Sequence, residues 1–193
     1  MDIIGIVGPL ACGKGVVADY LIKNYGYTSF SLSFIVHDEV RKRGIMRFDR
    51  TVLQDIGDEL RKKEGDGVLA KRAMLLLASD KKQKIIIEGI RNPGEVEYLR
   101  TIPGFFLVAV DSLQEVRFRR VIERGKPWDP KDWETFLKVD GRDSVDKKNM
   151  SGQQVQACMK LADVHLTNNT DLTQFYGDIE KAFISRRPLR TEY

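Results

Sequence analysis

Residues 8–15, Gly-Pro-Leu-Ala-Cys-Gly-Lys-Gly, have the composition and spacing of a loop that binds phosphate groups. The apolar run at residues 3–7 predicts a strand before them, and the apolar spacing in residues 16–21 predicts an amphipathic helix after them. In that setting, glycines let the backbone curl around an anion while N–H groups at the helix start point toward it. We therefore predict a nucleotide site in which Lys14 reaches the terminal phosphates. Its lining residues are expected to be Gly8, Cys12, Gly13, Lys14, Gly15 and Val16.

Glu88 and Arg91 form a second group that can bind charged ligands, directly after the apolar run at residues 85–87. A carboxylate at the end of a buried strand is placed to hold Mg²⁺, through water, beside nucleotide phosphates. Arg91 would reach outward to a second anion. As ordinary structural residues, Glu88 would instead cap a helix and Arg91 would be solvated.

Three arginines lie at spacings of three and four residues and so share one stripe of a predicted helix: Arg117, Arg120 and Arg124. Cations near a helix C-terminus can stabilise the helix by interacting with its macrodipole, and they can equally neutralise a phosphoryl group during its transfer. A neighbouring apolar stripe is expected to pack on the sheet: Phe118, Val121 and Ile122.

The segment after this helix combines prolines, glycines and charges with two tryptophans, Trp128 and Trp133. The polar residues indicate a surface loop, whereas the tryptophans indicate that the loop closes against other parts of the protein. A lid at residues 125–146 that shuts over a nucleotide and delivers Arg142 is consistent with both features. Ordinary packing beneath a long loop explains the tryptophans equally well.

The elements that must position these residues alternate between strand and helix. Apolar or alternating runs predict strands at residues 2–7, 27–32, 85–87, 105–110 and 164–166. Helical spacing predicts helices at residues 14–24, 33–43, 52–60, 68–77 and 113–124, a short helix in the lid, and a last helix over residues 172–183. We expect an α/β fold whose parallel sheet has helices on both faces and ligand sites at the carboxyl ends of the strands. After the last strand, Asn168 and Asn169 could contact a nucleotide base or have a structural role in a loop.

The composition is that of a modest globular enzyme of 193 residues, 42% of them hydrophobic, with a formal net charge of +4. At this length one domain spanning residues 1–193 is expected. The mild basic surplus suits an anionic ligand at least as well as a nucleic acid, so we expect nucleotide substrates rather than nucleic acid as partners. Two cysteines, Cys12 and Cys158, do not indicate a disulfide framework. Since neither a membrane span nor a signal-peptide pattern is evident, a cytoplasmic protein is expected.

Several of these features together resemble the adenylate kinase branch of the P-loop kinases. They are the Gly-Lys-Gly ending of the loop, the acid-Gly-x-Arg segment at residues 88–91, the paired arginines Arg120 and Arg124, and the lid with Arg142. Residues 89–95 are similar to a set of adenylate-kinase-related proteins common in archaea. The resemblance covers essentially the whole chain. It implies a three-layer P-loop NTPase fold with a five-stranded parallel sheet, an acceptor-binding helical segment at residues 31–80 and the lid.

The resemblance also implies an activity, which is transfer of a phosphoryl group from ATP, with Mg²⁺, to a small acceptor that is usually a nucleoside monophosphate. By this analogy Lys14 stabilises the β and γ phosphates, Glu88 organises Mg²⁺, and Arg91 holds the acceptor phosphate. Arg120 would contact ATP, while Arg124 and Arg142 neutralise the transferred group.

The sequence departs from that family on the acceptor side. The helix after the second strand usually begins with Asp, followed three residues on by Arg, but this chain has Phe34 and His37 there. Acceptor binding would then depend on His37 or Arg41 together with Arg91. Val16 also replaces the Thr that usually follows Gly-Lys-Gly.

Three functions therefore stay open at this stage. The first is a nucleoside monophosphate kinase. The second is a kinase whose acceptor is a hydroxyl, as in dephospho-coenzyme A kinase, with His37 or Asp38 as the general base. The third is a nucleotide-sensing regulatory module, or a slow ATPase with a protein or RNA partner, which the Phe34 and His37 changes and the basic residues 186–190 motivate.

Overall fold

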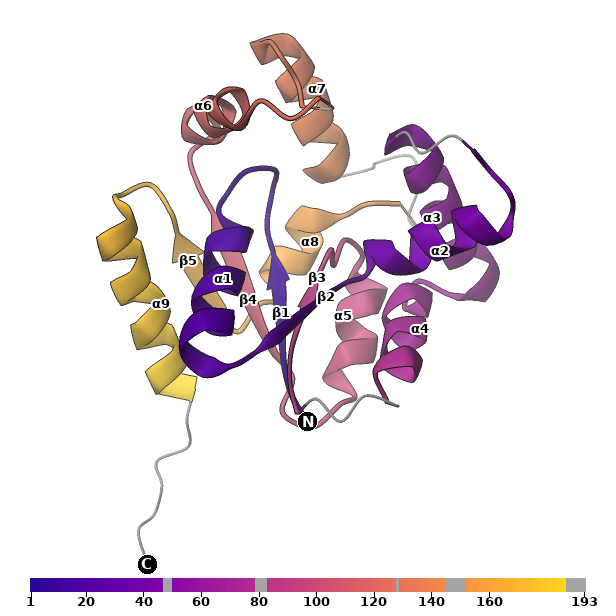
Figure 1. Cartoon of the computed structure of the whole chain (residues 1–193), viewed down its shortest axis with the longest axis horizontal. Helices are drawn as coiled ribbons and strands as arrows, with labels where there is room; N and C mark the ends of the chain where they lie inside the picture. The colour runs from indigo at the N-terminus through magenta and orange to yellow at the C-terminus, as the bar shows by residue number, and fades with distance from the viewer. Residues whose placement is uncertain (47–49, 79–82, 128, 145–151, 187–193) are drawn as a thin grey trace, which may run out of the picture.

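A parallel sheet runs through the centre of the computed structural model of the chain (Figure 1). The structure describes residues 1–46, 50–78, 83–127, 129–144 and 152–186, without the side chains of residues 50, 142–144, 185 and 186. Within these ranges the strands are β1 (Asp2–Val7), β2 (Thr28–Ser31), β3 (Lys84–Glu88), β4 (Phe106–Asp111) and β5 (Val164–Thr167). Their order is β2-β3-β1-β4-β5, with every pairing parallel. The predicted α/β fold with a five-stranded parallel sheet is confirmed.

Helices cover both faces of this sheet, as predicted (Figure 1). They are α1 (Lys14–Tyr25), α2 (Ser33–Lys42), α3 (Arg50–Glu64), α4 (Val68–Leu77), α5 (Pro93–Arg100), α6 (Gln114–Arg124), α7 (Trp133–Ser144), α8 (Val155–Lys160) and α9 (Leu172–Arg186). Helices α1 and α9 pack on one face, and α2 to α5 with α8 pack on the other. Helices α6 and α7 lie beyond the carboxyl ends of the strands (Figure 1). No helix in the described part of the chain is both long and apolar enough to cross a bilayer.

The apolar run in β3 explains why two helical layers form. Ile85 and Ile87 face the helices α2 to α5 and α8, whereas Ile86 faces α1 and α9. All three side chains are completely buried, as expected for a central parallel strand that is covered on both sides. The paired strands β1 and β3 therefore bring the loop after Val7 and the segment after Glu88 to the same edge of the sheet.

Two helices have no counterpart in the predictions from sequence, namely α5 and α8. Helix α5 begins with a capping box, in which the Asn92 side chain accepts from the backbone of the first turn and Glu95 accepts from the Asn92 N–H. Helix α8 has only six residues, too few for helical periodicity to be read with any weight.

The predicted packing of Phe118 on the sheet is wrong. The Phe118 ring lies 5.2 Å from the Trp133 ring and 5.4 Å from the Phe136 ring, both on α7, measured between centroids. Ile122 of the same stripe is 46% exposed. Because α6 lies beyond the strand ends, the aromatic side of α7 takes the place of the sheet as its packing partner. Trp133 thus contributes to the packing of α7 on α6, and Trp128 lies outside the described residues.

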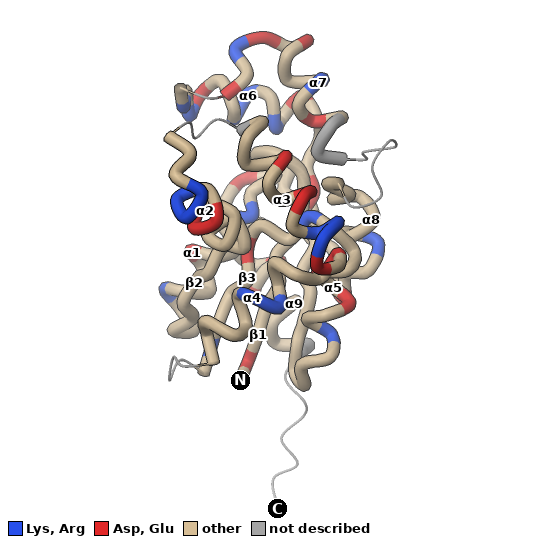
Figure 2. Tube along the Cα trace, turned by 90° about the vertical axis from the view of Figure 1, so that its right-hand side faces the viewer, with Lys and Arg blue, Asp and Glu red and all other residues tan. Residues whose placement is uncertain are grey.

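Helices α2, α3 and α4 are linked to one another by ion pairs. Arg43, which follows α2, pairs with Glu59 of α3 at 2.7 Å. Arg72 of α4 pairs with Glu39 of α2 at 3.2 Å and with Glu64 of α3 at 2.5 Å. Figure 2 accordingly shows acidic and basic positions interspersed on the side of the molecule that carries these helices. Such pairs contribute little each, but they join the three helices of the segment that is predicted to bind the acceptor.

Candidate nucleotide-binding site

The loop between β1 and α1 has the backbone geometry of an anion-binding turn. Gly13, the N-cap of α1, has φ 110° and ψ 17°, and Ala11 also has a positive φ of 59°. A side chain at Gly8 would collide with the backbone carbonyl of Val110 and lie 2.7 Å from the Cys12 sulfur. Gly13 provides no side-chain cap for α1, and the Val16 N–H donates to the Gly13 carbonyl at 3.0 Å. The uncapped start of a helix is a typical position for an anion.

Lys14 lies against this loop. Its ammonium donates to the carbonyl oxygens of Gly8 at 2.8 Å and Pro9 at 2.7 Å, and it lies 3.7 Å from the sulfur of the buried Cys12. A cation and a set of helix-start N–H groups are therefore concentrated in one turn. Gly15 and Val16 occupy the first turn of α1, where the sequence placed them.

Two side chains that are distant in sequence, Asn168 and Arg120, support the loop. The Asn168 amide, only 2% exposed, donates to the Cys12 carbonyl at 3.0 Å. Arg120 donates to the Asn168 carbonyl at 3.0 Å and to its side-chain oxygen at 3.1 Å, with a longer contact of 3.5 Å to Cys12. Asn168 thus supports the loop at residues 8–15, and its contact with a nucleotide base stays a prediction. Arg120 therefore lies beside the loop and contacts its backbone, while its predicted contact with ATP stays a prediction.

The arginine stripe of α6 divides into separate contacts. Arg117 is 6% exposed and pairs bidentately with Asp140 of α7, at 2.5 and 2.8 Å. It also donates to the Leu10 carbonyl of the loop at 3.2 Å, and Gln114 donates to Asp140 at 2.9 Å. Sequence reasoning did not single out Asp140, since nothing local indicates that it meets an arginine 23 residues away. This pair fixes α7 to α6 and to the phosphate-binding loop.

Arg124 is bound within the segment predicted to be a lid. Its Nε and Nη2 donate to the two carboxylate oxygens of Asp129 at 2.5 and 2.7 Å. The same contact lowers the pKa of the Asp129 carboxyl below its ordinary value. Arg142, the other arginine predicted for the lid, is part of α7, but its side chain lies outside the described residues.

Glu88 lies at the carboxyl end of β3, level with Ser31 of β2. Its position two residues after Ile86 directs it to the face of the sheet that α1 covers, and its carboxylate accepts from the Ser29 hydroxyl. No group of three or more His, Cys, Asp or Glu side chains that could hold a metal ion occurs among the described residues. A single carboxylate nevertheless fits Mg²⁺, which is usually held by one or two carboxylates, substrate phosphates and water.

The acceptor side contains an arginine stacked on an aromatic ring. Phe34 is 46% exposed, and the Arg41 guanidinium lies 5.6 Å from the centre of its ring. His37 lies half-buried on the same helix. Asp38 pairs with Lys42 at 2.7 Å, and this hydrogen bond lowers the pKa of the Asp38 carboxyl. Arg91 follows β3 and donates to the Gln153 side chain at 3.0 Å.

The turn with positive φ angles leads from a buried strand into a helix, and a lysine folds over it. A turn of this kind forms the site in a P-loop kinase-like domain. Residues 4–148 match the model of a family described as an AAA domain. The chain is 31% identical over 176 residues to a UPF0200 protein of Methanothrix thermoacetophila, covering 91% of this chain and 92% of that protein. It is 33% identical over 184 residues to a UPF0200 protein of Pyrococcus horikoshii, covering 93% and 94%. The chain thus belongs to the UPF0200 family and, over residues 4–148, to the AAA domain family.

Solved structures give the same fold. TT1252 from Thermus thermophilus matches with a TM-score of 0.65 and 20% identity, over 97% of this chain and 98% of that one. Shikimate kinase from Acinetobacter baumannii, solved in complex with shikimate, matches with a TM-score of 0.56 and 16% identity, over 97% and 95%. At such identities the likeness shows the kinase-like P-loop fold. The resemblance to the adenylate kinase branch in particular stays a prediction.

Proposed function

We propose that this protein transfers the γ-phosphoryl group of ATP to the phosphate of a small acceptor, with a nucleoside monophosphate as the first candidate. The observation that carries the proposal is the loop at residues 8–15. There Gly13 starts α1 without a side-chain cap, and the Lys14 ammonium lies among the loop carbonyls. Exchange of those carbonyls for phosphate oxygens would place Lys14 on the β and γ phosphates.

The surrounding residues supply the other parts that phosphoryl transfer requires, which are positioning and charge neutralisation. Mg²⁺ held through Glu88 would neutralise charge on the transferred phosphate. Arg91 would bind the acceptor phosphate. Arg124 would leave Asp129 for the transferred group, with Arg142 approaching from α7. Arg120 would hold the loop at residues 8–15 in place beside the nucleotide, through its contacts with Asn168 and Cys12.

The chemistry of the acceptor side favours a phosphate acceptor over a hydroxyl. A hydroxyl needs a general base to remove its proton, whereas a phosphate is already an anionic nucleophile. Of the two candidate bases, Asp38 is the poorer, because Lys42 binds its carboxylate and lowers its pKa, so a hydroxyl acceptor would depend on His37. Arg41 makes no ion pair among the described residues and lies over the exposed Phe34 ring. An aromatic face beside a cation suits an acceptor that carries both a planar base and a phosphate.

Formation of ADP from ATP and Mg²⁺, measured with a panel of acceptors, tests this proposal. The panel comprises the common nucleoside monophosphates, dephospho-coenzyme A and water alone. Stimulation by a monophosphate supports the proposal, whereas stimulation by dephospho-coenzyme A alone refutes it in favour of a hydroxyl acceptor. A low rate that no acceptor changes also refutes it and indicates a regulatory module or a slow ATPase. Lys14→Ala serves as the inactive reference.

A further inference from the structure

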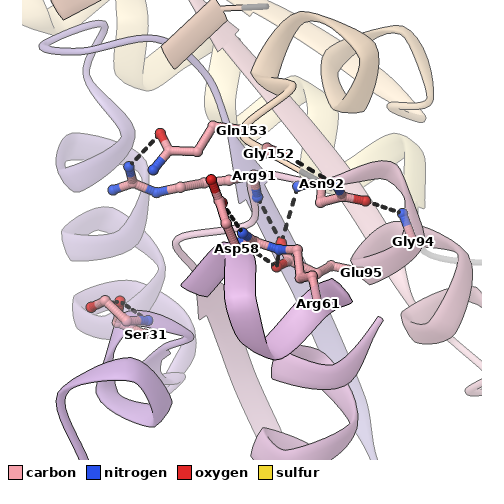
Figure 3. Close-up of polar contacts among 10 residues, drawn as sticks. Ser31, Asp58, Arg61, Arg91, Asn92, Gly94, Glu95, Gly152 and Gln153 are labelled. Atoms are coloured by element: carbon pink, nitrogen blue, oxygen red, sulfur yellow. Dashed lines mark hydrogen bonds and ion pairs between the residues drawn. The ribbon is translucent and has the colours of Figure 1, made fainter. Parts of the chain in front are cut away.

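Glu95, on α5, is a buried carboxylate whose contacts exceed what helix capping requires. Its side chain is 0% exposed. Oε2 accepts from the backbone N–H groups of Arg91 at 2.7 Å and of Asn92 at 3.1 Å (Figure 3). A capping box needs only the bond to Asn92, the N-cap residue. The additional bond to Arg91 ties the helix to the residue that is proposed to hold the acceptor.

The second oxygen of Glu95 binds an arginine from a different helix. Oε1 accepts from Nε and Nη2 of Arg61 at 3.1 and 2.9 Å. Arg61 lies on α3, is 4% exposed, and also donates to Asp58 at 3.1 Å. A buried charge that loses its partner is strongly destabilising. Helix α3 therefore cannot move away from the segment after β3 without leaving Glu95 uncompensated.

Arg91 is also held from the opposite side, by residues that follow the predicted lid in sequence. Its carbonyl accepts from the Gln154 N–H at 2.6 Å, and its Nη1 donates to the Gln153 side chain at 3.0 Å. Asn92 donates to the Gly152 carbonyl at 3.1 Å. In Figure 3 the Arg91 side chain extends away from Glu95, toward Gln153. The backbone of Arg91 is thus fixed at both its N–H and its carbonyl, and these bonds determine where its side chain starts.

We propose that Glu95 is a positioning residue that fixes the backbone of Arg91 and, through Arg61, couples the position of α3 to it. Movement of the acceptor-binding helices would then carry Arg91 with them, so that the acceptor's phosphate and the rest of the acceptor are bound as one unit. The kinetic consequence rests on the proposed function, because it requires that Arg91 binds the acceptor phosphate. The structural part does not.

Amide hydrogen exchange, followed by NMR without any substrate, tests the structural part. Glu95→Gln removes the negative charge and replaces one of the two accepting oxygens. Exchange rates at the Arg91 and Asn92 N–H groups should therefore rise by about tenfold or more, which corresponds to the free energy of one charge-assisted hydrogen bond. Exchange at Ile86, in the sheet core, reports global unfolding, and it should rise by less than exchange at Arg91 and Asn92, although Arg61 also loses its charged partner. Glu97→Gln, at an exposed position of the same helix, is the matched control. Unchanged exchange at Arg91, or an equal rise at Ile86, would overturn the inference. If Glu95→Gln does not fold, Arg61→Lys, which keeps the charge and loses the planar fork, is judged by the same criterion.

Steady-state kinetics with the acceptor found in the panel test the functional part. Glu95→Gln should raise the KM for the acceptor by about tenfold or more while the KM for ATP stays within about twofold. Adding Glu95→Gln to Arg91→Ala should cause no further loss, because Glu95 acts through Arg91. Equal rises in the KM values for acceptor and ATP, or additive losses of activity in the double variant, would contradict the positioning role of Glu95. If the wild-type protein transfers phosphate to no acceptor, the proposed function fails, and the exchange experiment alone decides whether Glu95 positions Arg91.

Discussion

Replacing Gly13 by alanine tests the geometry of the phosphate-binding loop most sharply. Gly13 has φ 110°, and a Cβ there would overlap the amide nitrogen of Asn168 and lie 3.2 Å from its Cγ. Asn168 has little room to yield, since its buried amide donates to the Cys12 carbonyl. Backbone strain at positive φ costs about 1–3 kcal/mol, and loss of the Asn168 hydrogen bond adds about 1 kcal/mol. We therefore expect Gly13→Ala to lower the free energy of unfolding by about 2–4 kcal/mol.

Urea denaturation monitored by circular dichroism measures this loss, and Gly15→Ala is the matched control two residues away. A Cβ at Gly15 meets no atom within 4 Å, and the residue lies in the first turn of α1. Alanine at a compatible position stabilises by about 0.4–1 kcal/mol, so the two variants should move in opposite directions. A Gly13→Ala variant within about 0.5 kcal/mol of the wild-type protein, the range of neutral substitutions, would refute the loop geometry.

Three further predictions concern buried or paired ionisable groups. Asp140→Ala should lower the free energy of unfolding by about 3–5 kcal/mol in the same assay, because it leaves Arg117 buried without its carboxylate; a loss near zero would contradict the buried pair. Burial raises the pKa of the Cys158 thiol. At about pH 8, near the ordinary cysteine pKa, iodoacetamide should therefore label Cys158 only after the protein unfolds. Peptide mass spectrometry measures the labelling. The Arg124 contact lowers the pKa of Asp129. The pair therefore stabilises the protein above about pH 4, the ordinary aspartate pKa. This contribution is lost as the pH falls through the lowered pKa. The stability difference between wild type and Asp129→Asn should accordingly vanish in acid, and a difference that persists there would be evidence against the pair.

The loop and the sheet could be predicted from sequence because their signals are local. Glycine spacing at residues 8–15 and the apolar runs of β1, β3 and β4 depend on neighbours within a few residues. The isoleucines of β3 predict burial on both faces, and the structure buries them completely. Strand ends then bring Gly13, Glu88 and Arg91 to one edge of the sheet by topology alone.

The contacts of the arginines could not be predicted in this way. Spacing placed Arg117, Arg120 and Arg124 on one stripe, but their partners are distant or unsignalled in sequence: Asp140 for Arg117, Asn168 for Arg120 and Asp129 for Arg124. The prediction that Phe118 packs on the sheet is wrong because an apolar stripe does not say which surface covers it. Periodicity identifies a buried face, and only the tertiary structure supplies its partner.

Glu95 was missed although a signal for it exists. Asn92 followed three residues later by a glutamate, with Pro93 between them, is the sequence pattern of a helix start. That pattern would have predicted α5 and the bond between Glu95 and the Asn92 N–H. It would not have predicted Arg61, which reaches Glu95 from a helix that is 34 residues away in sequence.

Calorimetric titration of ATP with Mg²⁺ into the wild-type protein, Lys14→Ala and Lys23→Ala tests the nucleotide site most directly. Lys23 is an exposed residue of the same helix, so its removal changes the net charge equally and leaves the loop intact. We expect Lys14→Ala to weaken ATP binding by about 10- to 100-fold, the equivalent of a charge-assisted contact, and Lys23→Ala to bind like the wild-type protein. Equal affinities for all three proteins, or no binding by the wild type, would contradict the nucleotide site on which the proposed function depends.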